Sequence, residues 1–119
     1  SGGIVDGNVR VKRATITLAT QTTSDTIVIA KATEGESFLY GIVNTDTSLG
    51  SAQIAIGVSG AVAKYKAAAV QTATNAPAIF GVNAGTATVT ASEEIFITIS
   101  AANLPASGNL VVDMYFSAT

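Results

Sequence analysis

An alternation of apolar and hydroxyl-bearing residues runs through most of this chain, and it constrains the fold more than any other feature of the sequence. Ala14, Ile16 and Leu18 alternate with threonines, so the apolar side chains would face one way and the hydroxyls the other. This period of two is typical of a half-buried β-strand, and the Val, Ile and Thr residues that dominate it favour strands. The sequence therefore predicts a protein built from β-structure.

Several short segments carry this pattern, and turn-forming sequences rich in Gly, Asn, Asp, Ser and Pro separate them. After a first strand within 9–18, the expected strands are 26–30, 37–44, 52–58, 77–82, 86–91, 94–100 and 109–117. The alanine-rich segment 63–73 is the one helical candidate, of a turn or two, because Ala favours helix. Strand lengths and spacings of this kind are typical of a sandwich or barrel, so we expect an all-β, antiparallel fold of about eight short strands with at most one short helix.

The beginning of the first strand is expected to be irregular. Val9 and Val11 stand at odd-numbered positions, whereas Ala14 and the apolar residues after it stand at even-numbered ones. If all of them face the core, the side-chain alternation must shift by one residue between Val11 and Ala14. A β-bulge inserts one extra residue and produces such a slip, and we expect one near Lys12 and Arg13.

The N-terminal residues are too poor in bulky side chains to fold alone. Three glycines occur in the first seven residues, and Ile4 and Val5 are the apolar pair among them. We therefore expect residues 1–8 to form a flexible arm and residues 9–119 to form a single β-sandwich domain. In an assembling protein such an arm often lies on a neighbour, which makes Ile4 and Val5 candidate contact residues.

The composition bounds the partners of the chain. Only 12% of the 119 residues are charged and the mean hydropathy is +0.46, whereas soluble domains carry about twice that share of charge. No apolar run approaches the ~20 residues of a membrane-spanning helix, and a net charge of −2 is unsuited to binding nucleic acid, so neither partner is expected. We expect instead that part of the surface is buried against copies of the chain, as a dimer or trimer, or against another protein.

Catalytic chemistry is not expected. The chain has no His and no Cys, and it contains no Ser-x-x-Lys, Gly-x-Ser-x-Gly or Gly-x-x-x-x-Gly-Lys motif. Common routes to an activated nucleophile or a phosphate loop are therefore missing. We expect a protein that is not an enzyme and that uses no cofactor.

One segment invites a comparison with a calcium-binding loop. Asn44, Asp46 and Ser48 place oxygens at the first, third and fifth positions of an EF-hand spacing. Leu49 stands where the glycine is required, and Ala55 stands where the bidentate glutamate is required. The segment is better interpreted as a turn that leads into a strand, and no metal is expected.

Two basic segments are candidate contact sites. Arg10, Lys12 and Arg13 form the densest cluster of positive charge, which suits either an acidic partner surface or a solvated strand face that discourages edge pairing.

The other segment is Lys64-Tyr65-Lys66. An aromatic residue between two lysines suits the core and rim of an interface, and the alternative is that Tyr65 caps the hydrophobic core.

The chain also resembles a known group of proteins. The run "DTIVIAKATEGESFLYGIVNTDTSLGSAQIAIGVSGAVAKYKAAA", then "PAIFGV" and "LPASGNLVVDMYFS", is similar to small proteins of tailed bacteriophages that are found with capsid genes. The resemblance covers about residues 25–117 and carries no catalytic signature. It implies a virion protein, most like a capsid decoration or cement protein. Such a protein is a jelly roll or related sandwich on the outer surface of the capsid, where it clamps neighbouring subunits of the major capsid protein.

Two other functions remain open. A carbohydrate-binding or receptor-binding module of a tail fibre would share the β-fold, although the chain has no Trp and only 6% aromatic residues. A subunit of a tail tube or a similar polymer would also be apolar and rich in Thr. The position of the protein in the virion separates these alternatives from the cement hypothesis.

Overall fold

The structure is a computed structural model that describes residues 8–82 and 88–118. These residues form β-strands and no helix, so none of them provides a helix able to span a membrane. The strands are β1 (Asn8–Thr17), β2 (Thr26–Ala32), β3 (Glu36–Thr45), β4 (Gln53–Val58), β5 (Ala61–Val70), β6 (Ala78–Phe80), β7 (Glu93–Ser100) and β8 (Asn109–Ala118). The expected all-β fold of about eight short strands is confirmed.

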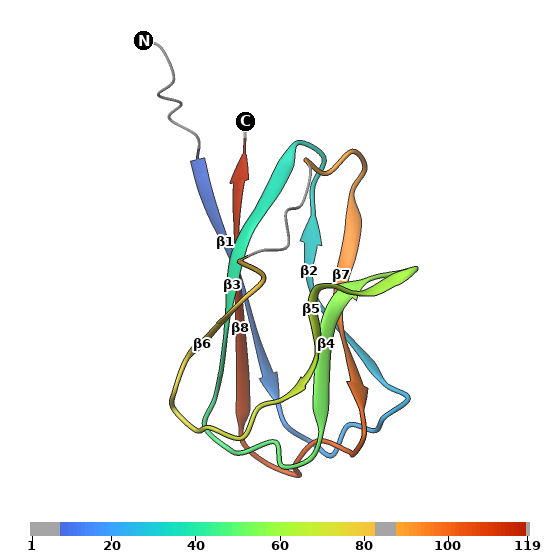
Figure 1. The fold of residues 1–119 in the computed structure, drawn as a ribbon, viewed down its shortest axis with the longest axis vertical. Coiled ribbons are helices and arrows are strands. Elements are labelled where there is room, and N and C mark those ends of the chain that lie inside the picture. Colours follow the sequence, from blue (N-terminus) through green and yellow to red (C-terminus); the bar gives the residue numbers. More distant parts are fainter. Residues whose placement is uncertain (1–7, 83–87, 119) are drawn as a thin grey trace.

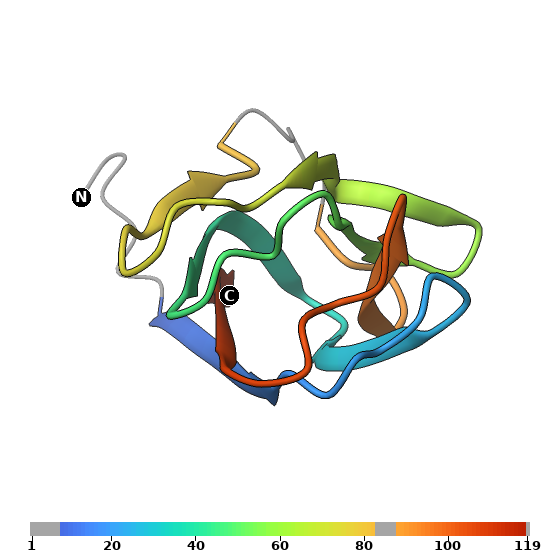
Figure 2. The ribbon, with the colours of Figure 1, turned by 90° about the horizontal axis from the view of Figure 1, so that it is seen from below.

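The strands form two antiparallel sheets of four, in the orders β1-β8-β3-β6 and β2-β7-β4-β5 (Figure 1). Each strand of the first half of the chain pairs with one of the second half: β1 with β8, β2 with β7, β3 with β6 and β4 with β5. Figure 2 shows the sheets as two layers, with β1 beside β2 along one side and β6 on the same side as β5. A long antiparallel ribbon rolled up in this way is the jelly-roll form of the sandwich.

The core lies between the sheets and is filled by the inward side chains of both. Phe38 on β3 is at its centre: its ring lies 4.7 Å from that of Tyr65, 6.1 Å from that of Phe80 and 5.5 Å from that of Phe116, measured between centroids. Because Tyr65 belongs to the opposite sheet, this cluster joins the two layers through edge-to-face contacts. The largest aliphatic contribution comes from Leu18, Ile54, Ile56, Ile95, Ile97, Ile99, Leu104, Leu110 and Met114.

The bulge expected near Lys12 and Arg13 is absent. β1 pairs with β8 without interruption from Asn8 to Thr17. Val9 and Val11 instead face outward, with 60% and 53% of their surfaces exposed, while Lys12 takes the inward position. The bulge prediction was wrong because the two valines face outward, so that the alternation continues without a slip.

The helix expected in 63–73 is also wrong, because residues 61–70 form strand β5. Alanine has a high helix propensity, but such propensities are small in energy, and pairing with β4 together with burial of Tyr65 outweighs them here. Of the expected strand 86–91, the first two residues lie outside the described residues and 88–91 are not in a strand. Val89 accepts a backbone hydrogen bond from Gly35 and donates one to Glu36.

Candidate interaction surfaces

The basic cluster on β1 is neutralised largely within the chain. Glu36, at the start of β3, is 1% exposed, and its carboxylate accepts hydrogen bonds from Lys12 Nζ at 2.7 Å and from Arg10 Nη1 at 3.1 Å. The backbone N–H of Thr33 donates to the same carboxylate at 2.7 Å. Lys12 Nζ also lies 4.7 Å from the centroid of the Phe116 ring, a cation–π contact. The inward position of Lys12 therefore places its ammonium group against the buried carboxylate of Glu36.

Opposing influences set the pKa of Glu36. Desolvation by burial is the largest single influence and would raise the pKa. The hydrogen bonds from Lys12, Thr33 and Arg10 favour the ionised form, and together they hold the pKa below its ordinary value of 4.5. Glu36 is therefore a buried anion at neutral pH.

Arg13 has a separate partner on β8. Its Nε and Nη2 atoms donate to the two oxygens of Asp113 at 2.7 and 2.9 Å, in the two-pronged arrangement that arginine and carboxylate prefer. The hydrogen bond to Asp113 raises the pKa of Arg13. Together with Arg10 and Lys12, Arg13 thus has a carboxylate partner within the chain, and a contact of these residues with an acidic partner stays a prediction.

The Lys64-Tyr65-Lys66 segment lies in β5, and the structure divides its three side chains. Tyr65 is 3% exposed and belongs to the core, which is one of the two interpretations that the sequence allowed. Lys66 Nζ donates to the carbonyl oxygens of Ile54 and Ala67, each at 3.3 Å, and partial burial lowers its pKa. A role of this segment in an interface stays a prediction.

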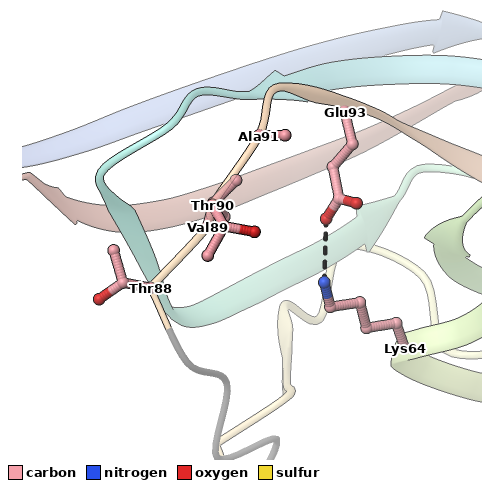
Figure 3. A pocket seen from close by; sticks show the side chains of 6 residues that line it. All are labelled: Lys64, Thr88, Val89, Thr90, Ala91 and Glu93. Carbon is pink, nitrogen blue, oxygen red and sulfur yellow. Dashed lines mark hydrogen bonds and ion pairs between the residues drawn. The ribbon is translucent and has the colours of Figure 1, made fainter.

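Lys64 closes one end of a small hollow beside β7 (Figure 3). Its Nζ donates to Glu93 Oε1 at 2.9 Å and lies 5.4 Å from the centroid of the Tyr65 ring; the hydrogen bond to Glu93 raises the pKa of Lys64. The hollow has a volume of about 270 Å³, and its lining consists of Lys64, Thr88, Val89, Thr90, Ala91 and Glu93. Within the described ranges, no three His, Cys, Asp or Glu residues gather as metal ligands would.

The segment compared with a calcium loop forms a turn between β3 and β4, as expected. Asp46 Oδ1 accepts hydrogen bonds from the backbone N–H of Asn109 at 2.8 Å and from the hydroxyl of Thr47 at 3.0 Å. The bond from Asn109 is the main cause of the lowered pKa of Asp46. Ser48 Oγ accepts from the N–H of Gly50, which has a φ of 64°. These oxygens hold the backbone of the turn in place.

The outward face of the β1-β8-β3-β6 sheet was not predicted from the sequence. Tyr40 on β3 and Tyr115 on β8 stack there, with ring centroids 4.6 Å apart and an angle of 11° between planes. A hollow of about 410 Å³ lies beside them, and its lining consists of Arg13, Ile42, Asn44, Pro77, Val111, Asp113 and Tyr115. The sequence did contain a sign of this face, because β3 and β8 have apolar residues at outward-facing as well as inward-facing positions. Ile4 and Val5 lie outside the described residues.

Comparisons with known proteins place this fold among chains of phage capsid structures. No protein-family model matches the chain, and no curated protein matches it. A chain of the solved "Cyanophage Pam1 capsid asymmetric unit" matches with a TM-score of 0.77 and 20% identity, covering 100% of this chain and 91% of that one.

Two further capsid structures contain a similar chain. For the "Capsid of Ralstonia phage GP4" the TM-score is 0.75 at 14% identity, covering 98% of this chain and 89% of that one. For the "Acidic stable capsid structure of Helicobacter pylori bacteriophage KHP30" it is 0.68 at 8% identity, covering 92% and 86%. The jelly roll described above is therefore a fold that this protein shares, over nearly its whole length, with chains of three phage capsid structures.

Proposed function

We propose that this protein is a structural component of a phage virion that binds the outer surface of the capsid and holds neighbouring subunits of the major capsid protein together. The observation that carries the proposal is the fold shared over nearly the whole chain with chains of three phage capsid structures. The resemblance of residues 25–117 to small virion proteins, drawn from the sequence, supports it independently.

The geometry suits a protein that clamps others. A cement protein must transmit force without deforming, and the aromatic cluster around Phe38 ties one sheet to the other. Its contact surface must also be desolvated at a low cost in free energy when it binds. Low charge serves that requirement, as does the pairing of Arg10, Lys12, Arg13 and Lys64 with carboxylates of the same chain.

The edge strand β5 is the described segment that best fits a capsid contact. Eight of its ten residues are exposed, and the hairpin that joins it to β4 projects from the body of the sandwich (Figure 1). Val62 near the tip of this hairpin is 48% exposed. A neutral, apolar projection can enter a depression of a partner surface with little desolvation cost.

Purified virions provide the test. Electron microscopy with antibody against this protein should place the label on the head, and capsid shells that lack the protein should bind it when it is added back. Label on a fibre would favour the receptor-binding alternative, and label along the tail would favour a tube subunit; either result would refute the proposal.

The contact itself can be tested with two matched variants. Val62→Glu should weaken binding to the shells at least about tenfold, because each contact must then bury an unpaired carboxylate. Val28→Glu, a change at a similarly exposed position on β2, should bind like the wild type. Shells bound equally by both variants would remove the β4–β5 hairpin from the contact.

A further inference from the structure

The outward face of the β1-β8-β3-β6 sheet has an ordered pattern that the core does not require. The strand register aligns its side chains in rows across the strands. One row contains Val11, Tyr115 and Tyr40, and the next contains Arg13 and Asp113. That second row continues through Ile42 to Ile79 on β6, and a third row consists of Thr15, Val111 and Asn44.

This face is apolar and electrically neutral. Val9, Val11 and Ile79 are each more than half exposed, and Val11 lies beside the stacked tyrosines in the strand register. Among the described outward-facing residues of the four strands, Arg13 and Asp113 are the charged ones, and they neutralise each other through two hydrogen bonds. Exposed apolar area gathered on one sheet face, with aromatic and arginine side chains at its centre, is typical of the core of a protein interface.

The neutrality of the face decides which partner it suits. A face with net charge would repel a second copy of itself, whereas this one does not. Two copies related by a twofold axis would place two Arg13-Asp113 pairs in one interface, where each cation can also approach the carboxylate of the other copy. Such pairs would mainly fix the orientation of the two copies and add little to the affinity, because the cost of desolvating the charges offsets most of their attraction.

The size of the face also fits self-association. β1, β3 and β8 have ten residues each, so the sheet extends about 33 Å along the strands and about 15 Å across them. That is about 500 Å² in projection, and projecting side chains expose more than the projected area. The face therefore approaches the ~800 Å² that each partner contributes to a stable interface.

An unpaired polar atom beside the face gives a second indication. Asn44 lines the hollow of about 410 Å³, and its Oδ1 atom is buried without a hydrogen-bond partner among the described residues. A buried acceptor of this kind lowers stability until it is paired. Rotation of the Asn44 amide would present it to donors of a second molecule, and Arg13 and the Tyr115 hydroxyl are donors on the same face.

We infer that this outward face, formed by β1, β8, β3 and β6, is the contact surface of a symmetric dimer in which two copies pack sheet against sheet. The outward rows of each copy interdigitate in the way that the two layers of one sandwich do. The inference goes beyond capsid binding and does not depend on it. It assigns the stacked tyrosines and Ile79 to contact with a second copy of this chain.

Sedimentation equilibrium of the full chain over about a hundredfold range of concentration tests this. The wild type should be a dimer, and Val11→Glu and Ile79→Glu should each raise the dissociation constant at least tenfold. Both side chains are exposed, so the circular dichroism and melting of the monomer should be unchanged. Val28→Glu, on the other sheet and 56% exposed, is the matched control and should dimerise like the wild type.

Other outcomes would overturn the inference. A wild type that stays monomeric, or face variants that dimerise as tightly as the wild type, would show that the face is not used. Disruption by Val28→Glu alone would place the interface on the other sheet. A trimer would exclude the symmetric arrangement, because a contact of one face with itself closes at two copies. Binding of the variants to capsid shells is measured separately, so a failed dimer and a failed capsid contact remain distinguishable.

Discussion

Replacement of Glu36 by glutamine should destabilise the protein strongly at neutral pH. The substitution keeps the shape of the side chain but leaves Lys12 and Arg10 without their anion. Removing one partner of a buried ion pair costs about 3–5 kcal/mol. Because 20% of the Lys12 side chain and 52% of the Arg10 side chain are exposed, both can recover some hydration, and we expect about 2–3 kcal/mol.

For a chain of 119 residues, that loss corresponds to a fall in melting temperature of about 8–12 °C. Urea unfolding followed by circular dichroism, at matched protein concentrations, gives the free energy directly. Glu34→Gln removes the same charge from an exposed turn two residues away and should change stability by less than about 0.5 kcal/mol. The free energy of unfolding of Glu36→Gln should therefore differ from that of this control by several times the error of the measurement.

The pH dependence supplies a second readout of the same reasoning. The pKa of Glu36 is lower in the folded chain than its ordinary value of 4.5, so its contribution is fully present above pH 4.5. That contribution is lost as the pH falls through the folded pKa, and the gap between wild type and Glu36→Gln should close in the same range. A gap under about 0.5 kcal/mol at pH 7, or one that stays constant down to pH 3, would refute the account of Glu36 as a buried anion.

Four further outcomes are expected. Tyr65→Ala should cost about 3–5 kcal/mol in urea unfolding of the protein without any partner, because the ring is packed in the core; a change below about 1 kcal/mol would favour the interface role. Gly41→Ala should cost about 1–3 kcal/mol in the same assay, because a Cβ there would overlap the Phe80 ring, and Gly41→Ala combined with Phe80→Leu should recover part of it. A chelator should leave the melting temperature within a few degrees, because Asp46 is occupied by backbone and hydroxyl donors; a larger fall would indicate a metal. Deletion of residues 1–8 removes only the first residue of β1 and should leave the domain folded while lowering the temperature at which virions release their genome; virions of unchanged heat resistance would contradict the proposed role of the arm.

The sequence was sufficient for most strands and for the class of fold, because alternation and turn chemistry act locally. Segment 94–100 was placed within one residue of β7, and the Asp46 turn was recognised from its composition. β5 was misjudged because its alanines carry almost no periodic signal, and its structure depends on pairing with β4. Local preference decides little when a tertiary partner is available.

The candidate sites were harder to predict, since their partners are distant in the chain. Lys12 meets Glu36 across 24 positions, and Arg13 meets Asp113 across 100. A cluster of positive charge on β1 therefore suggests a binding patch until the fold supplies the carboxylates. The stacking of Tyr40 on Tyr115 is hidden for the same reason, because it depends on the β3–β8 register.

The internal pairing of charge changes what kind of contact this protein can make with its partners. With Glu36 and Asp113 neutralising β1, two surfaces present mainly apolar side chains: the outward face of the β1-β8-β3-β6 sheet and the hairpin that joins β4 to β5. These two surfaces lie on different sheets, because β4 and β5 belong to the β2-β7-β4-β5 sheet. A protein that clamps a capsid needs separate surfaces for separate neighbours, since one surface can hold only one partner at a time. If the outward face binds a second copy, each dimer carries two hairpins, and linked contacts of this kind hold a lattice more tightly than either contact alone.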